Sequence, residues 1–243
     1  NVRRLMMLLS RTLRRRGMTY VFEPNGPVLR RAVERSLTAT LDDLQQRGAF
    51  AGASSAQSYR IAVQESDADV DGGRLIVEIG AGNGDSLVAT AAAHPDTDIV
   101  GFEVFEPSIA STLGKLAAQN LTNARVVLAD GVQGLRWLVR PDSLDAVHAF
   151  FPDPWHKSRH HKRRLISPEV CALVADRLRP GGLLRVATDW EDYALAMREI
   201  LDASPLTNEH SRWAPRFDER PMTKYEARGI AAGRTVYDLC YRR

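Results

Sequence analysis

Cysteine is scarce in this chain, and long apolar runs are absent. The two cysteines among its 243 residues, Cys171 and Cys240, lie far apart in the sequence and form no CxxC pair. This argues against a zinc site and favours a reducing compartment. The apolar segment 5–9 is too short for the core of a signal peptide, and no stretch is long enough to cross a bilayer. These absences predict a soluble cytoplasmic protein with no bound metal and no membrane partner.

Positive charge is clustered rather than spread along the chain. The net charge is only +3, and the hydrophobic fraction of 44% is ordinary for a globular protein. Residues 1–16 nevertheless contain six arginines and no acid, which predicts a basic arm or a disordered tail. We expect a leading part, residues 1–73, made of this arm, a helix at 28–47 and a linker at 48–73 rich in Gly, Ala, Ser and Asp.

From residue 74 the pattern becomes a regular alternation of strands and helices. Alternation of this kind predicts an α/β fold, with a parallel sheet covered by helices on both faces, over residues 74–243. The end of the chain predicts an extended stretch near 206–213 and an irregular, arginine-containing segment. The expected strands are 75–79, 98–102, 125–129, 144–151, 183–188 and 234–242, and the expected helices are 86–93, 107–120, 131–139, 168–178 and 190–202.

A glycine-rich turn follows the first expected strand. It reads Gly80-Ala81-Gly82-Asn83-Gly84, so the third glycine comes one position early for the dinucleotide fingerprint, and Asp85 stands where that fingerprint has glycine. A carboxylate there would repel a pyrophosphate. S-adenosylmethionine has no phosphate and carries a sulfonium cation, so acids near its site favour binding. The turn therefore favours S-adenosylmethionine over NAD.

Acidic residues stand in or at the end of three successive expected strands. Glu103 ends the second strand, where a carboxylate can accept hydrogen bonds from both ribose hydroxyls. Asp130 ends the third and is placed to lie near the adenine, although it precedes a helix and could serve only as its N-cap. Glu78 lies just before the glycine turn, where it would order the loop, meet the amino group of the ligand, or be a buried structural acid.

The most unusual segment is 150–164. It starts apolar, continues as Pro152-Asp153-Pro154, and ends in five Lys or Arg and three His with no acid among them. The prolines stiffen the backbone around Asp153. A fixed carboxylate beside a dense positive run indicates a polyanionic substrate with one group to be placed accurately. The alternative is a surface turn that happens to be basic.

Together these segments resemble the bacterial tRNA (guanine-N7-)-methyltransferase (TrmB) family. The resemblance runs from about residue 74 to the C-terminus and rests on 78–84, 101–103, 150–164, 187–190 and 220–226. It implies a class I S-adenosylmethionine-dependent methyltransferase fold, Rossmann-like, with a mostly parallel seven-stranded sheet. It also implies methylation of N7 of a guanosine in the variable loop of tRNA, conventionally position 46. Monomer and homodimer are both left open.

The resemblance also assigns roles to individual residues. It makes Asp153 the catalytic residue and implies that residues 223–226 contact the substrate. Thr223 and Glu226 also have the spacing of a helix capping box, so they could equally only start a helix. The implied cofactor-binding residues are Glu78, Gly80, Gly82, Gly84, Glu103, Asp130 and Asp153; the substrate-binding residues are Lys157, Asp189, Thr223, Lys224, Tyr225 and Glu226; and the RNA-binding residues are Arg159, His160, His161, Lys162, Arg163 and Arg164.

The chemistry of guanine N7 simplifies the expected mechanism. N7 has a lone pair and no proton, so the enzyme must place it in line with the methyl group and needs no general base. A carboxylate from Asp153, Asp189 or Glu226 would accept from guanine N1–H and the exocyclic amine. Trp155 or Trp190 would assist the base in leaving its stack, unless they only pack in the core. The alternatives are a methyltransferase for another RNA or a small molecule, and an inactive tRNA-binding protein.

Overall fold

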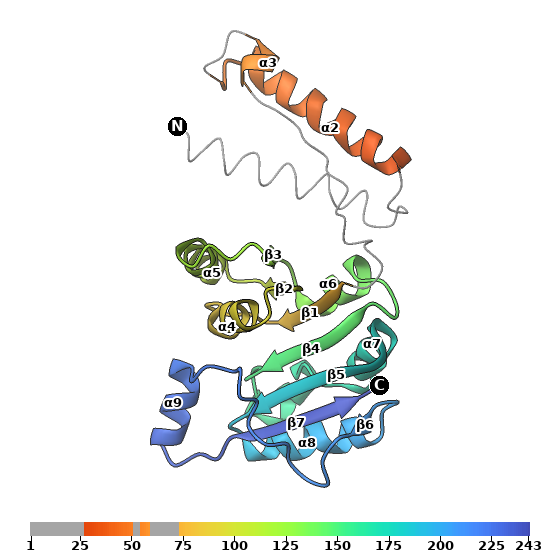
Figure 1. Ribbon diagram of the computed structural model, residues 1–243, viewed down its shortest axis with the longest axis vertical. Coiled ribbons are helices and arrows are strands. Elements are labelled where there is room, and N and C mark those ends of the chain that lie inside the picture. The colour runs from red at the N-terminus through yellow and green to blue at the C-terminus, as the bar shows by residue number, and fades with distance from the viewer. Residues whose placement is uncertain (1–26, 51–53, 59–72) are drawn as a thin grey trace. The chain divides into compact units, whose positions relative to one another are not determined.

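The computed structural model describes residues 27–50, 54–58 and 73–243 (Figure 1). The predicted basic arm and most of the predicted linker at 48–73 lie outside these residues. Backbone contacts divide the chain into two units, Asn1–Val70 and Asp71–Arg243. The expected boundary between residues 73 and 74 remains a prediction.

The first unit contains helix α2 (Pro27–Gln46) and the short helix α3 (Ser55–Ser58). Pro27 opens α2 at the position where its missing N–H costs nothing, and the expected helix at 28–47 is confirmed. α3 falls in a segment expected to be irregular. Ser55 Oγ donates to Asp42 Oδ1 at 2.5 Å, so a side-chain contact with α2 accompanies this single turn.

Within residues 73–243 the strands form one seven-stranded sheet, in the order β3-β2-β1-β4-β5-β7-β6. The first five strands in the chain run parallel, whereas β7 is antiparallel to β5 and β6 is antiparallel to β7. Figure 1 shows β7 pointing against β4 and β5. The strands are β1 (Arg74–Ile79), β2 (Thr97–Glu103), β3 (Ala124–Leu128), β4 (Leu144–Phe150), β5 (Leu178–Thr188), β6 (Thr207–Asn208) and β7 (Tyr237–Arg242).

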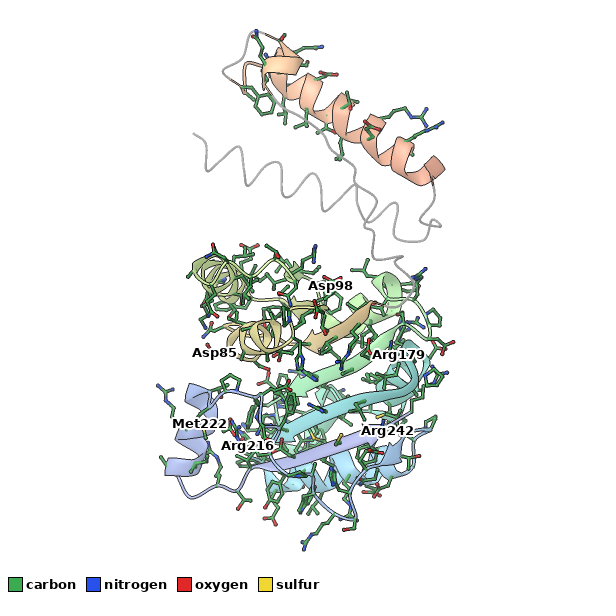
Figure 2. All side chains as sticks on the ribbon, in the orientation of Figure 1. Asp85, Asp98, Arg179, Arg216, Met222 and Arg242 are labelled. Carbon is green, nitrogen blue, oxygen red and sulfur yellow. The ribbon has the colours of Figure 1, made fainter. Side chains whose placement is uncertain are left out.

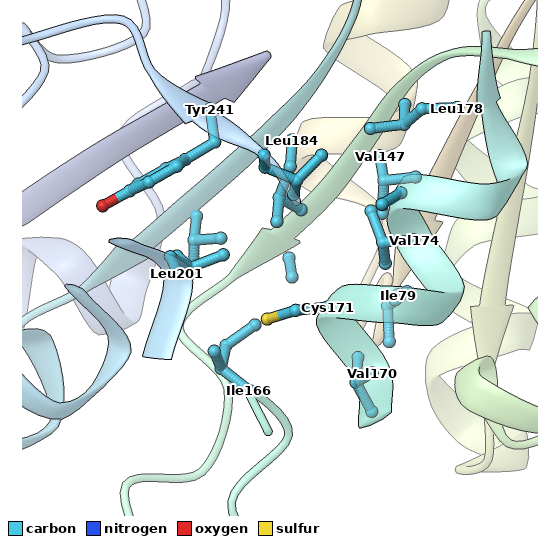
Figure 3. Packing of buried hydrophobic residues seen from close by; sticks show 14 of the residues in the cluster. Ile79, Val147, Ile166, Val170, Cys171, Val174, Leu178, Leu184, Leu201 and Tyr241 are labelled. Atoms are coloured by element: carbon cyan, nitrogen blue, oxygen red, sulfur yellow. The ribbon is translucent and has the colours of Figure 1, made fainter. Parts of the chain in front are cut away.

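Helices cover both faces of this sheet, as expected. α4 and α5 pack on one face through Leu87, Val88 and Leu116. The other face carries the larger core, shown in part in Figure 3, to which α6, α7 and α8 contribute Leu135, Val174 and Met197. The helices are α4 (Asp85–Ala93), α5 (Glu106–Ala118), α6 (Gly131–Leu138), α7 (Pro168–Arg177), α8 (Glu191–Asp202) and α9 (Lys224–Ala231), with a 3₁₀ helix, η2 (Ser158–Arg163).

The expected starts of two strands in the C-terminal half were wrong. β5 begins at Leu178 rather than 183, because the segment 180–182 continues the strand after an irregularity in its pairing with β4. Gly181 takes a left-handed conformation (φ 83°) that permits this. The extended stretch at 206–213 contains only two strand residues, and β7 starts at Tyr237 rather than 234.

The strand order places a switch point beside β1. The chain moves outward from β1 to β2 and β3, then returns to the other side of β1 with β4 and β5. In open α/β sheets, ligands bind beyond the carboxyl ends of the strands at such a point. The fold therefore predicts a site where β1 and β4 end.

Candidate active site at the carboxyl edge of the sheet

A cavity of about 550 Å³ lies at this edge. Its walls come from the glycine turn after β1, the loop after β4, the loop after β5, and the segment from Arg220 to Arg234 around α9. Figure 1 shows α9 beyond the ends of β4 and β5. The lining residues include Glu78, Gly80, Gly82, Asp153, His156, Asp189, Trp190, Arg220, Thr223, Arg228 and Arg234.

The glycine turn adopts a backbone that favours glycine. Gly80, Gly82 and Gly84 have φ values of 71°, 53° and 78°. A Cβ on Gly84 would meet Thr112 Oγ1 at 2.4 Å, whereas one on Gly80 would meet nothing within 4 Å. Gly84 is thus required by packing against α5, and it is not among the residues that line the cavity. Gly80 and Gly82 present bare backbone to it.

Glu103 anchors this turn from the neighbouring strand. Its carboxylate accepts from the N–H groups of Gly82, Val104 and Phe105, each at 2.8 Å. The residue is buried and does not itself line the cavity. Sequence reasoning missed this task, and the predicted contact with a ribose remains a prediction.

Asp130 caps a helix. Its Oδ1 accepts from Gln133 N at 3.0 Å, at the start of α6, so the N-cap alternative is confirmed. Asp130 is exposed and lies outside the cavity lining. A contact with adenine is therefore not visible in this geometry.

Glu78 lies deep in the cavity. Burial raises the pKa of Glu78 to about 8, and nearby Asp85 also raises it, while Ser86 lowers it. Within the part of the chain that the structure describes, its Oε2 is buried without a hydrogen-bond partner. The neighbouring strand places His148 in register with it, and burial, with help from Arg185 and His94, lowers the pKa of His148 to about 3. Of these two buried neighbours, Glu78 is therefore the one whose pKa lies near neutral pH.

The loop after β4 holds Asp153 at the cavity. Phe151 and Trp155, on either side of the proline-aspartate motif, have φ values of 52° and 48°, a conformation that costs roughly 1–3 kcal/mol for such side chains. Phe151 N donates to Ala187 O on β5 at 2.7 Å, which fixes one end of the loop. Asp153 is exposed and lines the cavity, and its predicted roles in cofactor binding and catalysis remain predictions.

The central part of the basic run at 156–164 forms η2, and its arginines and lysines differ in exposure. Arg159, Lys162 and Arg163 are exposed, with Arg163 lying over the Trp155 ring at 5.0 Å. Arg164 instead points inward, with its side chain only 7% exposed and paired with Asp192. The expectation that Arg164 contacts RNA is therefore not supported, because its guanidinium is occupied within the protein.

The remaining basic-run residues have mixed surroundings. Lys157 precedes η2 and is exposed but does not line the cavity. His160 packs edge-on against Trp155, and His161 contacts Arg164. His156 lies 4.1 Å, ring centre to ring centre, from Trp190, and both line the cavity. This aromatic pair was not predicted as a unit.

Asp189 lies across the cavity, at the end of β5. Its Oδ2 accepts from Arg234 Nε at 2.8 Å. Gly229 of α9 packs so closely that a Cβ there would lie 2.6 Å from the same oxygen. The Asp189 carboxylate is therefore held in place by α9 and the residues after it.

The segment 223–226 starts α9. Thr223 Oγ1 accepts from Glu226 N at 3.1 Å, which confirms the capping alternative. The Glu226 carboxylate is buried and pairs with Arg216 and Arg220; Figure 2 labels Arg216. Glu226 is therefore not presented to a substrate, whereas Thr223 lines the cavity. Lys224 and Tyr225 form the first turn of α9.

Arg220, Arg228 and Arg234 were missed as individual site residues. All three line the cavity. Of the three, only Arg220 lies in a segment, 220–226, on which the family resemblance rests.

Across the described residues, no group of three or more His, Cys, Asp or Glu could hold a metal ion. None of the described helices combines the length and apolar character that a bilayer crossing requires.

Comparisons with known proteins show the family to which the chain belongs. Residues 73–239 match the family model described as "Putative methyltransferase". The chain is similar to proteins named tRNA (guanine-N(7)-)-methyltransferase from Cutibacterium acnes (54% identity over 70% of this chain and 63% of the relative), Nocardioides sp. (54%, 70% and 67%) and Paraburkholderia xenovorans (48%, 69% and 65%). The match thus spans less than two thirds of the length of the first and third of these relatives and about two thirds of the second.

Solved structures support the fold alone. The chain is similar to the 16S rRNA methyltransferase KamB (TM-score 0.56, 16% identity, 75% of this chain and 95% of that one) and to an antibiotic-related methyltransferase (0.54, 16%, 76% and 97%). These confirm the expected class I methyltransferase fold. A second family model, the phage tail sheath C-terminal domain, matches residues 1–90. It covers less than half the chain and overlaps β1 and α4, which belong to the methyltransferase sheet.

Proposed function

Because this chain belongs to the bacterial tRNA (guanine-N7-)-methyltransferase family, we propose that it transfers a methyl group from S-adenosylmethionine to N7 of guanosine 46 in the variable loop of tRNA. The observation that carries the proposal is the position of Asp153. It lines a cavity that also contains the bare glycine turn, and the exposed arginines and lysine of η2 follow it in the chain.

The cavity has the features that this cofactor requires. Gly80 and Gly82 let a ligand approach the backbone closely, and Glu78 offers a buried carboxylate oxygen without a partner among the described residues. When bound there, S-adenosylmethionine supplies an electrophilic methyl group on a sulfonium. Glu78, Gly80, Gly82 and Asp153 would hold it, and Glu103 would act by fixing the turn.

The target guanine is then held by the carboxylates at the rim. Asp153 and Asp189 both line the cavity and come from neighbouring strands. A carboxylate that accepts from N1–H and the exocyclic amine fixes the base and stabilises the positive charge that develops on it as N7 is methylated. Asp189 suits this task because Arg234 and Gly229 already hold its orientation.

The base must leave its stack to enter this cavity. His156 and Trp190, in ring contact at the cavity wall, provide a surface on which it can stack. Arg159, Lys162 and Arg163 would neutralise neighbouring phosphates, because they are exposed and close in sequence to Asp153. The proposed partner is therefore tRNA.

The test uses tRNA transcribed in vitro, which carries no modified bases, and S-adenosylmethionine labelled with tritium in the methyl group. We expect label in N7-methylguanosine, and none when guanosine 46 is replaced by adenosine. Label in another nucleoside would assign a different RNA target. Tight tRNA binding without any transfer would instead favour the inactive binding protein.

A further inference from the structure

Arg220 is a completely buried arginine in the wall of the active-site cavity. Its side chain is 0% exposed, and its guanidinium lies 5.2 Å from the ring centres of both Phe150 and Phe151. These two residues lead directly into the loop that carries Asp153. Arg220 therefore links the cavity wall to that loop.

Two carboxylates pair with Arg220 through Nη1 and Nη2 but leave its third nitrogen, Nε, without a partner among the described residues. Nη1 and Nη2 donate to Asp238 at 2.5 and 3.1 Å, and Nη2 also donates to Glu226 at 3.0 Å. Arg216 donates to the same Glu226 at 3.0 and 3.2 Å, so the four charges balance. Among the described residues the Nε–H of Arg220 has no acceptor, although it is buried. Such a donor is costly unless something completes its hydrogen bond.

The same cavity also contains a hydrogen-bond acceptor without a partner among the described residues. Glu78 Oε2 is buried and, within the described chain, unpartnered. Glu78 is in register with His148 on β4, and Phe150 follows two residues later on the same face. Strand spacing and rise put the Cα atoms of Glu78 and Phe150 roughly 8 Å apart. The free carboxylate oxygen and the guanidinium over Phe150 thus flank one region.

We propose that Arg220 Nε–H binds the α-carboxylate of the methionine part of S-adenosylmethionine, while Glu78 accepts from its α-ammonium group. The Nε–H of a cation and the unpartnered oxygen of an acid match the two ends of a zwitterion. A phosphate would satisfy Arg220 but be repelled by Asp153, which lines the same cavity. The adenine and ribose of the cofactor carry no charge that would pair with Arg220 or with Glu78. This inference rests on the proposed use of S-adenosylmethionine and names a residue that positions it.

The test measures binding rather than turnover, by calorimetry with S-adenosylhomocysteine and with its decarboxylated analogue. In Arg220→Lys the positive charge beside Asp238 and Glu226 is kept, but the Nε donor is lost. We expect this variant to bind S-adenosylhomocysteine roughly 10- to 100-fold more weakly and the decarboxylated analogue as the wild type does. The matched control is Arg216→Lys, which touches the same Glu226 but does not line the cavity; it should bind both ligands normally.

The outcomes separate the inference from the function on which it rests. Equal affinity of the wild type and Arg220→Lys for S-adenosylhomocysteine overturns the role of Arg220 alone. Failure of the wild type to bind S-adenosylhomocysteine overturns the proposed function. If Arg220→Lys does not fold, the ¹⁵N-detected Nε–H signal of Arg220 in the wild type decides: it should shift with S-adenosylhomocysteine and not with the decarboxylated analogue. The same shift with both ligands would overturn the inference.

Discussion

Arg164 Nε donates a hydrogen bond of 2.9 Å to the carbonyl oxygen of Pro154, ten residues earlier in the chain. The same guanidinium lies 4.7 Å from the centre of the Tyr193 ring and pairs with Asp192. The last residue of the basic run therefore ties the loop of Asp153 to α8. The loop is held at both ends, since Phe151 is bonded to β5.

This contact predicts that Arg164→Ala reduces the methylation rate more than tRNA affinity. The loop would lose a charge-assisted hydrogen bond worth about 1.5–3 kcal/mol, and Asp153 would no longer be fixed. Single-turnover methylation and filter binding measure the two effects. The control is Lys162→Ala, an exposed neighbour for which affinity should fall and the rate at saturating tRNA should hold. The reverse pattern would show that Arg164 contacts RNA.

The exposed part of the basic run should govern salt dependence. Replacing Arg159, Lys162 and Arg163 by Ala should weaken tRNA binding and flatten its dependence on salt by roughly 0.7–0.9 log units per lost phosphate contact. Arg125→Ala, on edge strand β3, should leave the slope unchanged. Affinity for S-adenosylhomocysteine should stay the same in both variants. An unaltered slope in the triple variant would make η2 a solvated surface only.

Asp153→Asn should lose turnover far more than tRNA affinity. Affinity comes mainly from cationic contacts with phosphate, and Asp153 would repel phosphate. Asparagine keeps the shape but replaces one acceptor oxygen with a donor and removes the charge at the cavity. A ~100-fold fall in the single-turnover rate would correspond to about 2.7 kcal/mol. A wild-type rate in this variant would remove Asp153 from the mechanism.

Glu78 should make the folded protein less stable as the pH rises. Its pKa is raised from 4.5 to about 8 by burial, so between these values the folded chain holds a proton that the unfolded chain has lost. The free energy of unfolding should therefore fall with rising pH, by at most about 1.4 kcal/mol per unit from this group. Urea unfolding at several pH values across this window measures the slope.

Glu78→Gln is the matched comparison for that slope. The variant cannot ionise, so its stability should fall less with pH than that of the wild type. His148 contributes in the opposite direction, since its pKa is lowered to about 3, but it is present in both proteins and cancels in the difference. Parallel pH profiles for the two proteins would show that Glu78 is ionised in the folded chain.

Two helical glycines should respond oppositely to alanine. In Gly229→Ala the new Cβ would lie 2.6 Å from Asp189 Oδ2, whereas in Gly114→Ala it would meet nothing within 4 Å. Gly114→Ala should raise the free energy of unfolding by about 0.5–1 kcal/mol with unchanged activity. Gly229→Ala should lower the methylation rate while the protein remains folded. Normal activity in Gly229→Ala would show that the position of Asp189 is not critical.

Local patterns in the sequence were sufficient to predict strands β1 to β4, whereas the mostly parallel seven-stranded sheet was implied by the family resemblance. Each of these strands is a short apolar run followed by a helix, so β1 to β4 and helices α4 to α7 appear close to the expected residues. The strand ends also predicted that Asp153 and Asp189 would share one edge. These features depend on nearby residues and on the general rule for parallel sheets.

The parts that sequence could not predict depend on distant partners. Glu103 binds backbone N–H groups of the glycine turn, and Glu226 pairs with arginines six and ten residues away. No periodicity reveals which acid faces a ligand and which faces the protein. The inward turn of Arg164 within an otherwise exposed basic run is hidden for the same reason, because its partner Asp192 lies on another helix.

The late position of β7 and α9 in the chain has a consequence during synthesis on the ribosome. A nascent chain that has reached Thr188 contains β1 to β5 but not the residues that close the cavity, Arg220, Thr223 and Arg234. Its β5 has an unpaired outer edge, open to pairing with another chain, until β7 is made. The same event that protects this edge brings Asp238 to Arg220. Pairing of β7 with β5 therefore covers the edge of the sheet and also supplies the partner of Arg220 in the cavity wall.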